Sequence, residues 1–71
     1  MGKYYECLTG VVRCITAPQE NKYNFVVGND YDIVDGEIKG VVCDFNAIDL
    51  DELNWFFEKE KIKFELIEKG D

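Results

Sequence analysis

The sequence contains no serine and no histidine. Their absence excludes a serine nucleophile, a histidine general base and imidazole ligands for a metal ion. Carboxylates remain as candidates for acid–base chemistry, but a chain of 71 residues has little room for a pocket beside its core. We therefore expect no enzyme activity, no cofactor and no metal site, and we expect the protein to act by binding.

Long apolar runs are also missing. None approaches the ~20 residues needed to span a bilayer, and 32% of the residues are charged. The amino-terminal segment has no apolar signal-peptide region. The chain has three cysteines, an odd number without a C-x-x-C pair, whereas small secreted domains usually have an even disulfide framework. The sequence therefore predicts a cytoplasmic protein with reduced thiols and no membrane association.

The length predicts a single domain, residues 1–71, near the lower limit for one hydrophobic core. Aromatic residues make up 14% of the chain, and large rings bury much apolar area per residue. Segments that are β-branched or alternate between apolar and polar residues predict five strands. These are residues 11–16, 23–27, 31–34, 37–45 and 62–66.

Two local signals connect these strands. Asp35-Gly36 predicts a type I′ hairpin turn, which needs positive φ at both central positions. Asp49 and Glu52 have the spacing of a helix capping box, and apolar residues follow at helical offsets. A short helix or 3-10 turn is therefore expected within residues 46–57. The whole pattern predicts a mainly β, SH3-like five-stranded barrel, with an open sheet packed on one helix as the alternative.

Several segments resemble small proteins of phages and prophages. The segments are residues 13–15 (Arg-Cys-Ile), residues 25–34 (Phe-Val-Val-Gly-Asn-Asp-Tyr-Asp-Ile-Val), residues 42–44 (Val-Cys-Asp) and residues 64–65 (Phe-Glu). The resemblance covers residues 11–67 loosely. It implies an SH3-like fold and an origin in a mobile element. Because such proteins mostly have no assigned activity, it implies no catalytic residue.

The formal net charge is −7, and the acidic residues concentrate in one part of the chain. Residues 30–60 contain ten acidic residues and two lysines, a formal charge of −8, whereas the remainder is close to neutral. A concentrated negative field repels phosphate, so we expect no direct nucleic-acid binding. The field attracts a basic protein surface, on which carboxylates can occupy the positions of phosphates. The alternative is a solvated surface that keeps a small protein soluble and monomeric.

The candidate partner-binding residues are eight acidic residues and one tryptophan. They are Asp30, Asp32, Asp35, Glu37, Asp44, Asp49, Asp51, Glu52 and Trp55. Trp55 is included because the run Trp55-Phe56-Phe57 cannot point inward from a helix at all three positions, and tryptophan is enriched at binding hot spots.

These features predict a small acidic accessory protein of the phage or prophage type that binds a protein with a basic surface. Inhibition of a host nucleic-acid-handling or defence protein, by DNA mimicry of the anti-CRISPR kind, is one form of this function. The alternative is an adaptor or assembly module that uses the aromatic patch, as a monomer or a homodimer. A third interpretation is a groove for proline-rich peptides lined by Tyr4, Tyr5, Tyr31 and Trp55.

Overall fold

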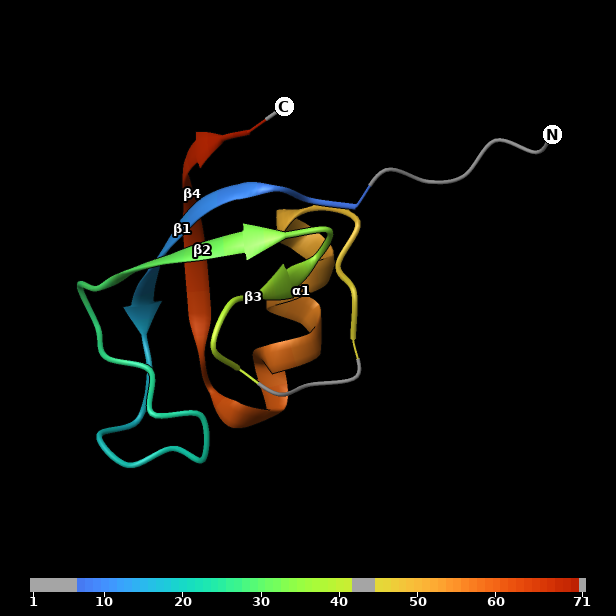
Figure 1. The fold of residues 1–71 in the computed structure, drawn as a ribbon. Helices are drawn as coiled ribbons and strands as arrows, with labels where there is room; N and C mark the ends of the chain where they lie inside the picture. Colours follow the sequence, from blue (N-terminus) through green and yellow to red (C-terminus); the bar gives the residue numbers. More distant parts are fainter. Residues whose placement is uncertain (1–6, 42–44, 71) are drawn as a thin grey trace, which may run out of the picture.

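The computed structural model describes residues 7–41 and 45–70. These residues form one antiparallel sheet and one helix, so the predicted mainly β class is confirmed (Figure 1). The strands are β1 (Gly10–Thr16), β2 (Asp30–Val34), β3 (Glu37–Ile38) and β4 (Lys63–Lys69). Their order in the sheet is β3-β2-β1-β4. The described residues thus contain four strands in an open sheet, where five strands in a closed barrel were expected.

The Asp35-Gly36 turn between β2 and β3 is confirmed. Asp35 has φ 52° and Gly36 has φ 79°, the left-handed values that a two-residue hairpin of this kind needs. The turn also docks against two distant segments. The Gly36 N–H donates to the carbonyl of Leu8 at 2.7 Å, and the Gly36 carbonyl accepts from the N–H of Ala47 at 3.0 Å. The hairpin end is therefore held between the residues before β1 and those before the helix.

The helix α1 (Leu50–Phe57) lies within the predicted range and is followed by a short 3-10 helix, η1 (Glu58–Glu60). Asp49 is its N-cap and accepts a hydrogen bond from the Glu52 N–H at 2.9 Å. The Glu52 side chain in turn accepts from the Ile48 N–H at 2.8 Å. These reciprocal bonds satisfy backbone donors at the helix start, as a capping box does.

Residues 23–27 do not form the predicted strand. Their hydrogen bonds are made with side chains and within the loop, where the Asn24 N–H donates to the Asn21 carbonyl at 3.1 Å, instead of with a neighbouring strand. The Asn21 carboxamide accepts from the Phe25 N–H at 2.9 Å and donates to the Phe25 carbonyl at 3.1 Å, while the Val26 N–H donates to the Tyr31 hydroxyl. Asn24 has φ 61°, which interrupts an extended backbone. The segment is a loop that places Phe25 in the core.

The strand predicted for residues 37–45 is also shorter than expected. Glu37 and Ile38 pair with β2, and the Lys39 N–H makes one more hydrogen bond, to the Asp32 carbonyl at 2.9 Å. Gly40 then takes φ 84°, and the Val41 N–H donates back to the Ile38 carbonyl at 3.2 Å, so the chain turns away from the sheet. The part of this prediction that covers residues 42–44 lies outside the described residues.

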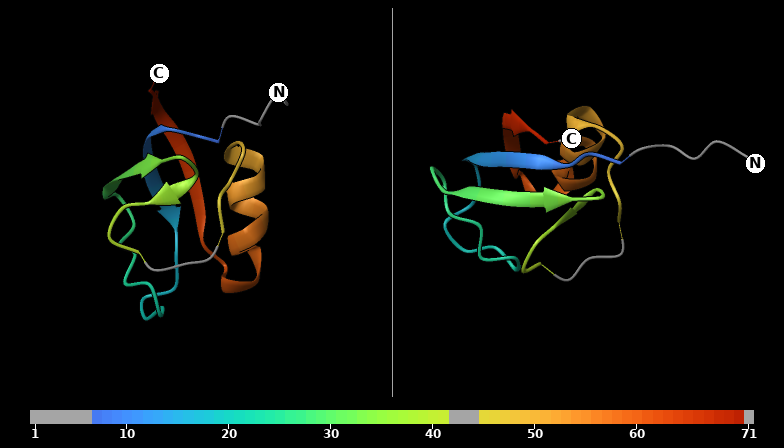
Figure 2. Two further views of the ribbon diagram at one scale, coloured as in Figure 1. Left: turned by 45° about the vertical axis from the view of Figure 1, so that its right-hand side comes forward. Right: turned by 45° about the horizontal axis from the view of Figure 1, so that its top comes forward.

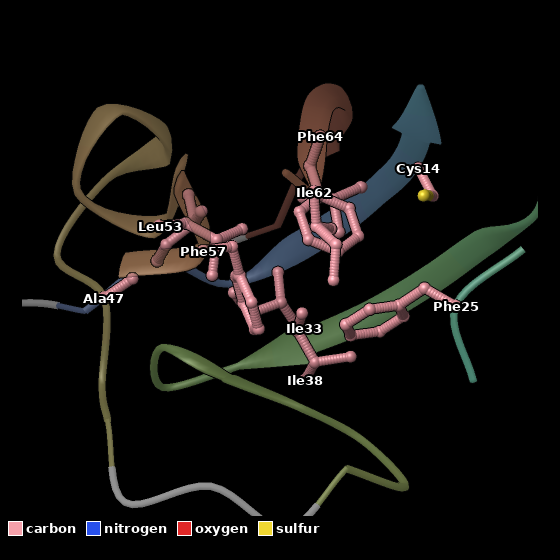
Figure 3. Packing of buried hydrophobic residues seen from close by; sticks show 11 residues of the cluster. Cys14, Phe25, Ile33, Ile38, Ala47, Leu53, Phe57, Ile62 and Phe64 are labelled. Atoms are coloured by element: carbon pink, nitrogen blue, oxygen red, sulfur yellow. The ribbon is translucent and has the colours of Figure 1, made fainter. Parts of the chain in front are cut away.

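The core lies between one face of the sheet, α1 and the loop between β1 and β2. Figure 3 shows Leu53 and Phe57 of α1 facing Ile33 of the sheet, with Phe25 entering from the loop. Phe57 is at the centre of a group of rings and lies 5.2–5.6 Å from those of Tyr23, Phe25 and Phe64. Edge-to-face contacts of this kind add to the gain from burying the rings. The opposite face of the sheet is not covered by the helix.

The helix also covers part of a sheet edge. Figure 2 shows α1 lying alongside β4, the last strand of the sheet. The Asn54 carboxamide accepts from the Phe64 N–H at 2.8 Å and donates to the Phe64 carbonyl at 3.0 Å. It thus takes the place of a neighbouring strand at this point, which protects the edge from pairing with another chain. Neither helix in the described part of the chain is long and apolar enough to cross a membrane.

Candidate functional site

The outward face of the sheet carries acidic side chains from several strands. Along β2, Tyr31 and Ile33 point towards the core, whereas Asp30 and Asp32 are exposed on the other face. This alternation follows from the period of two of a strand. Glu37 of β3 is exposed in the same way, next to buried Ile38. Three of the predicted site residues therefore lie on one face of the sheet.

The strand register brings two more acidic residues to this face. Arg13 of β1 lies between Asp30 of β2 and Glu65 of β4, and Val11 lies between Asp32 and Glu68. Neighbouring strands are about 4.8 Å apart, so these side chains form two short rows across the sheet. We define the acidic face as the five exposed carboxylates of these strands: Asp30, Asp32, Glu37, Glu65 and Glu68.

Glu65 and Glu68 were missed because they lie outside the acidic segment 30–60. The alternation of residues 62–66, with Phe64 inward and charges outward, was the one signal that could have indicated Glu65. Its position beside Arg13, and that of Glu68 beside Val11, follow only from the pairing of β4 with β1.

Arg13 is the basic residue between Asp30 and Glu65, and it is paired with Asp30. Its Nε lies 2.7 Å from Oδ1 of Asp30, with side chains that are 42% and 44% exposed. The hydrogen bond from Arg13 lowers the pKa of the Asp30 carboxyl, and the opposite charge adds to the effect. Because the pair is exposed, it contributes little to the free energy of folding. It does fix the position of one carboxylate on the acidic face.

The Arg13–Asp30 pair predicts a pH effect that NMR can measure. The carboxyl of Asp30 should titrate below the ordinary range of aspartate, and Arg13→Gln should return its pKa towards that range. A lowered pKa means that the pair is complete above the unfolded-state pKa and is lost as pH falls through the folded-state pKa. Lys22→Gln, which removes the partner of Glu60, should leave Asp30 unchanged. An Asp30 titration that Arg13→Gln does not move would contradict this ion pair.

The hairpin end joins the acidic face to the segment before α1. The Asn46 carboxamide donates to the Asp35 carbonyl at 2.9 Å and to the Glu37 carboxylate at 3.0 Å. Asp35 itself is exposed in the turn, two residues before Glu37.

The acidic residues of α1 lie elsewhere. Asp49 and Glu52 accept backbone hydrogen bonds at the helix start, so their carboxylates have a structural role. Asp51 is exposed in the first turn, on the layer that covers the inner face of the sheet. The predicted acidic residues thus divide between the outward sheet face with its hairpin and the helix. Asp44 lies outside the described residues.

Trp55 is 68% exposed on α1 and lines a groove of ≈ 520 Å³ beside the start of β4. Asp51, Trp55 and Glu58 line this groove from the two helices, and Lys61 and Lys63 line it from the segment that leads into β4. Tyr31 does not share the groove, because its ring packs at 5.2 Å from that of Phe25. The described residues of the predicted peptide groove, Tyr31 and Trp55, are therefore in different environments.

The described side chains do not form a metal site. Within residues 7–41 and 45–70, no three side chains of histidine, cysteine, aspartate or glutamate come together in a way that could hold a metal ion. Comparison of the chain with protein-family models, curated proteins and solved structures finds no match in any of the three. The resemblance to phage and prophage proteins stays a prediction from the sequence.

Proposed function

We propose that this chain is a small accessory protein of the phage or prophage type that binds a basic protein surface through its acidic face. The expected partner is a protein that handles nucleic acid, whose phosphate-binding groove the face occupies as a DNA mimic. The SH3-like resemblance of the sequence agrees with such an origin. In this function the protein has no catalytic step and no cofactor, and it does not bind nucleic acid itself.

The observation that carries the proposal is the arrangement of the acidic face. Asp30 and Asp32 project from β2, and Glu65 and Glu68 project from β4, in two rows around Arg13 and Val11 of the intervening strand β1. Carboxylates on a paired sheet are held by the backbone, so their arrangement costs little further entropy on binding. Such a fixed negative surface speeds the encounter with a basic partner and repels free nucleic acid.

A matched pair of double variants tests the proposal. Asp32→Lys with Glu68→Lys reverses the acidic face, whereas Asp51→Lys with Glu58→Lys reverses two exposed acids of the groove. Each variant raises the formal net charge from −7 to −3, two units per reversal, so the two differ only in where the charge changes. Circular dichroism would establish that both retain the fold.

Each variant and the wild-type chain would be immobilised and exposed to a bacterial lysate. We expect wild-type chain and the groove variant to retain a basic protein that double-stranded DNA releases, because DNA competes for the same surface. The face variant should bind that protein at least about a hundredfold more weakly. Its new lysines would face the basic surface of the partner, and like charges placed opposite each other cost several kcal/mol. Equal retention by the face variant, or direct binding of DNA by the wild-type chain, would refute the proposal.

The alternative function, an assembly module, is favoured by a different observation. Trp55 is the only tryptophan of the chain, and its ring is exposed beside the groove although the neighbouring Phe57 is buried. Exposed tryptophan in a groove is a common anchor of protein interfaces.

A further inference from the structure

We infer that the groove beside Trp55 is the contact between two copies of this chain, which associate around a twofold axis. The inference is independent of the acidic face, because it concerns another surface and another partner. Asp30, Asp32 and Glu37 lie on β2 and β3, which β1 separates from the β4 edge where the groove lies. Glu65 and Glu68, which β4 contributes to the acidic face, do not line the groove.

The helical side of the groove combines negative charge with an anchor. Asp51, Trp55 and Glu58 are spaced by four and three residues, so they follow one stripe of the helix. The indole is the most apolar part of this stripe and is 68% exposed. Burial of this ring against a partner would remove apolar surface from water, and this favours association.

The other side of the groove has the opposite charge. Lys61 follows η1 and Lys63 begins β4, and both are exposed. These lysines do not neutralise Asp51 and Glu58 within the chain, because the ion pairs among the described residues are Arg13–Asp30 and Lys22–Glu60. Two acids and two bases therefore face solvent on the two sides of one hollow.

This arrangement is complementary to itself. In a twofold dimer each surface patch meets its own copy, so the acidic helical side of one protomer faces the lysines of the other. Trp55 of each protomer can then lie against the groove of its partner. The groove is locally neutral in a chain of net charge −7, so two copies approach here without the repulsion that opposes contact elsewhere.

Asn54 favours docking of side chains over pairing of strands. Its carboxamide occupies the Phe64 N–H and carbonyl on the β4 edge, beside the groove. An incoming strand cannot use these backbone groups. Backbone pairing is therefore blocked at this point. Contact with a second copy must be made by side chains, those of the helical stripe and of the two lysines.

Self-association would be measured by sedimentation velocity and by the emission of Trp55 across the micromolar range, where weak specific contacts form. The wild-type chain should dimerise as its concentration rises, with Trp55 emission shifting to shorter wavelength. Trp55→Ala should weaken the dimer at least about thirtyfold, as expected for a central aromatic anchor. Its sedimentation alone would then report the loss.

Charge exchange gives the decisive comparison. The acid-side variant, Asp51→Lys with Glu58→Lys, and the base-side variant, Lys61→Glu with Lys63→Glu, should each dimerise at least about tenfold more weakly than the wild-type chain. Mixed together, they should form a one-to-one heterodimer, because each now presents the charge that the other lacks. The acid-side variant has the smaller net charge, so a general charge effect would make it associate more strongly.

Heterodimer formation also proves that both variants are folded. A wild-type chain that stays monomeric with constant Trp55 emission, or variants that fail to pair when mixed, would overturn the dimer. If the emission instead shifts only when an arginine-rich peptide is added, the groove binds the basic partner and the dimer is equally overturned. The capture experiment with Asp32→Lys and Glu68→Lys does not depend on dimerisation, so failure of the dimer is distinguishable from failure of the proposed function.

Discussion

Gly36→Ala should destabilise the fold by about 3–5 kcal/mol, a large part of the about 4–11 kcal/mol available to a chain of this size. Gly36 has φ 79°, a region that costs other residues about 1–2 kcal/mol. A Cβ atom at this position would also lie 2.5 Å from the Ala47 nitrogen and 2.6 Å from its carbonyl oxygen. Relief of that contact breaks the hydrogen bonds that hold the hairpin end.

Thermal and urea unfolding followed by circular dichroism would measure this loss, with a fall in Tm of about 15 °C or more. Gly28→Ala is the matched control, since Gly28 has φ 96° and no described atom lies within 4 Å of its added Cβ. The free energy of unfolding of this variant should fall only by the conformational cost, about 1–2 kcal/mol. Equal decreases in the free energy of unfolding for the two variants would show that the Ala47 backbone moves aside without cost and that the hairpin end is not firmly held.

Phe57→Ala should destabilise the protein by about 3–5 kcal/mol. The Phe57 side chain is 1% exposed, and its ring contacts those of Tyr23 and Phe25 in the loop between β1 and β2 and that of Phe64 in β4. Truncation leaves a cavity where the helix, the loop and the sheet meet, and no neighbouring side chain can fill it without leaving its own contacts. The denaturant midpoint should fall accordingly in urea unfolding.

Trp55→Ala is the control on the same helix. Trp55 is a larger residue but it is exposed, so its removal should change the free energy of unfolding by no more than about 0.5 kcal/mol. Both variants would be measured at a concentration below that of self-association, so that only the fold is tested. A loss for Trp55→Ala equal to that for Phe57→Ala would mean that the indole packs against the fold rather than facing a partner.

The acidic residues that are candidates for binding have two different physical roles. Asp32 and Glu68 are exposed carboxylates on strands, whereas Asp49 and Glu52 hold the start of the helix through backbone hydrogen bonds. A reversal of Asp49 or Glu52 would therefore damage the helix as well as any interface. Asp32 and Glu68 give a cleaner test of the acidic face.

Local chemistry determined several elements in advance. The alternation of residues 62–66 placed Phe64 in the core, because successive residues of a strand point to opposite faces. Asp35-Gly36 specified its turn, since few residue pairs adopt positive φ at both positions. Asp49 and Glu52 marked the helix start, because each satisfies a backbone donor within four residues. Each of these signals is complete within a few neighbouring residues.

Tertiary structure decided what depends on residues far apart in the chain. Residues 23–27 have a strand-like pattern, but the Asn21 side chain and the Tyr31 hydroxyl take their hydrogen bonds, so no strand forms. Glu65 and Glu68 join the acidic face only because β4 pairs with β1. The charge-complementary groove likewise needs α1 and the start of β4 side by side. Residue patterns determine which way a side chain points, whereas strand pairing and helix docking determine which side chains become neighbours.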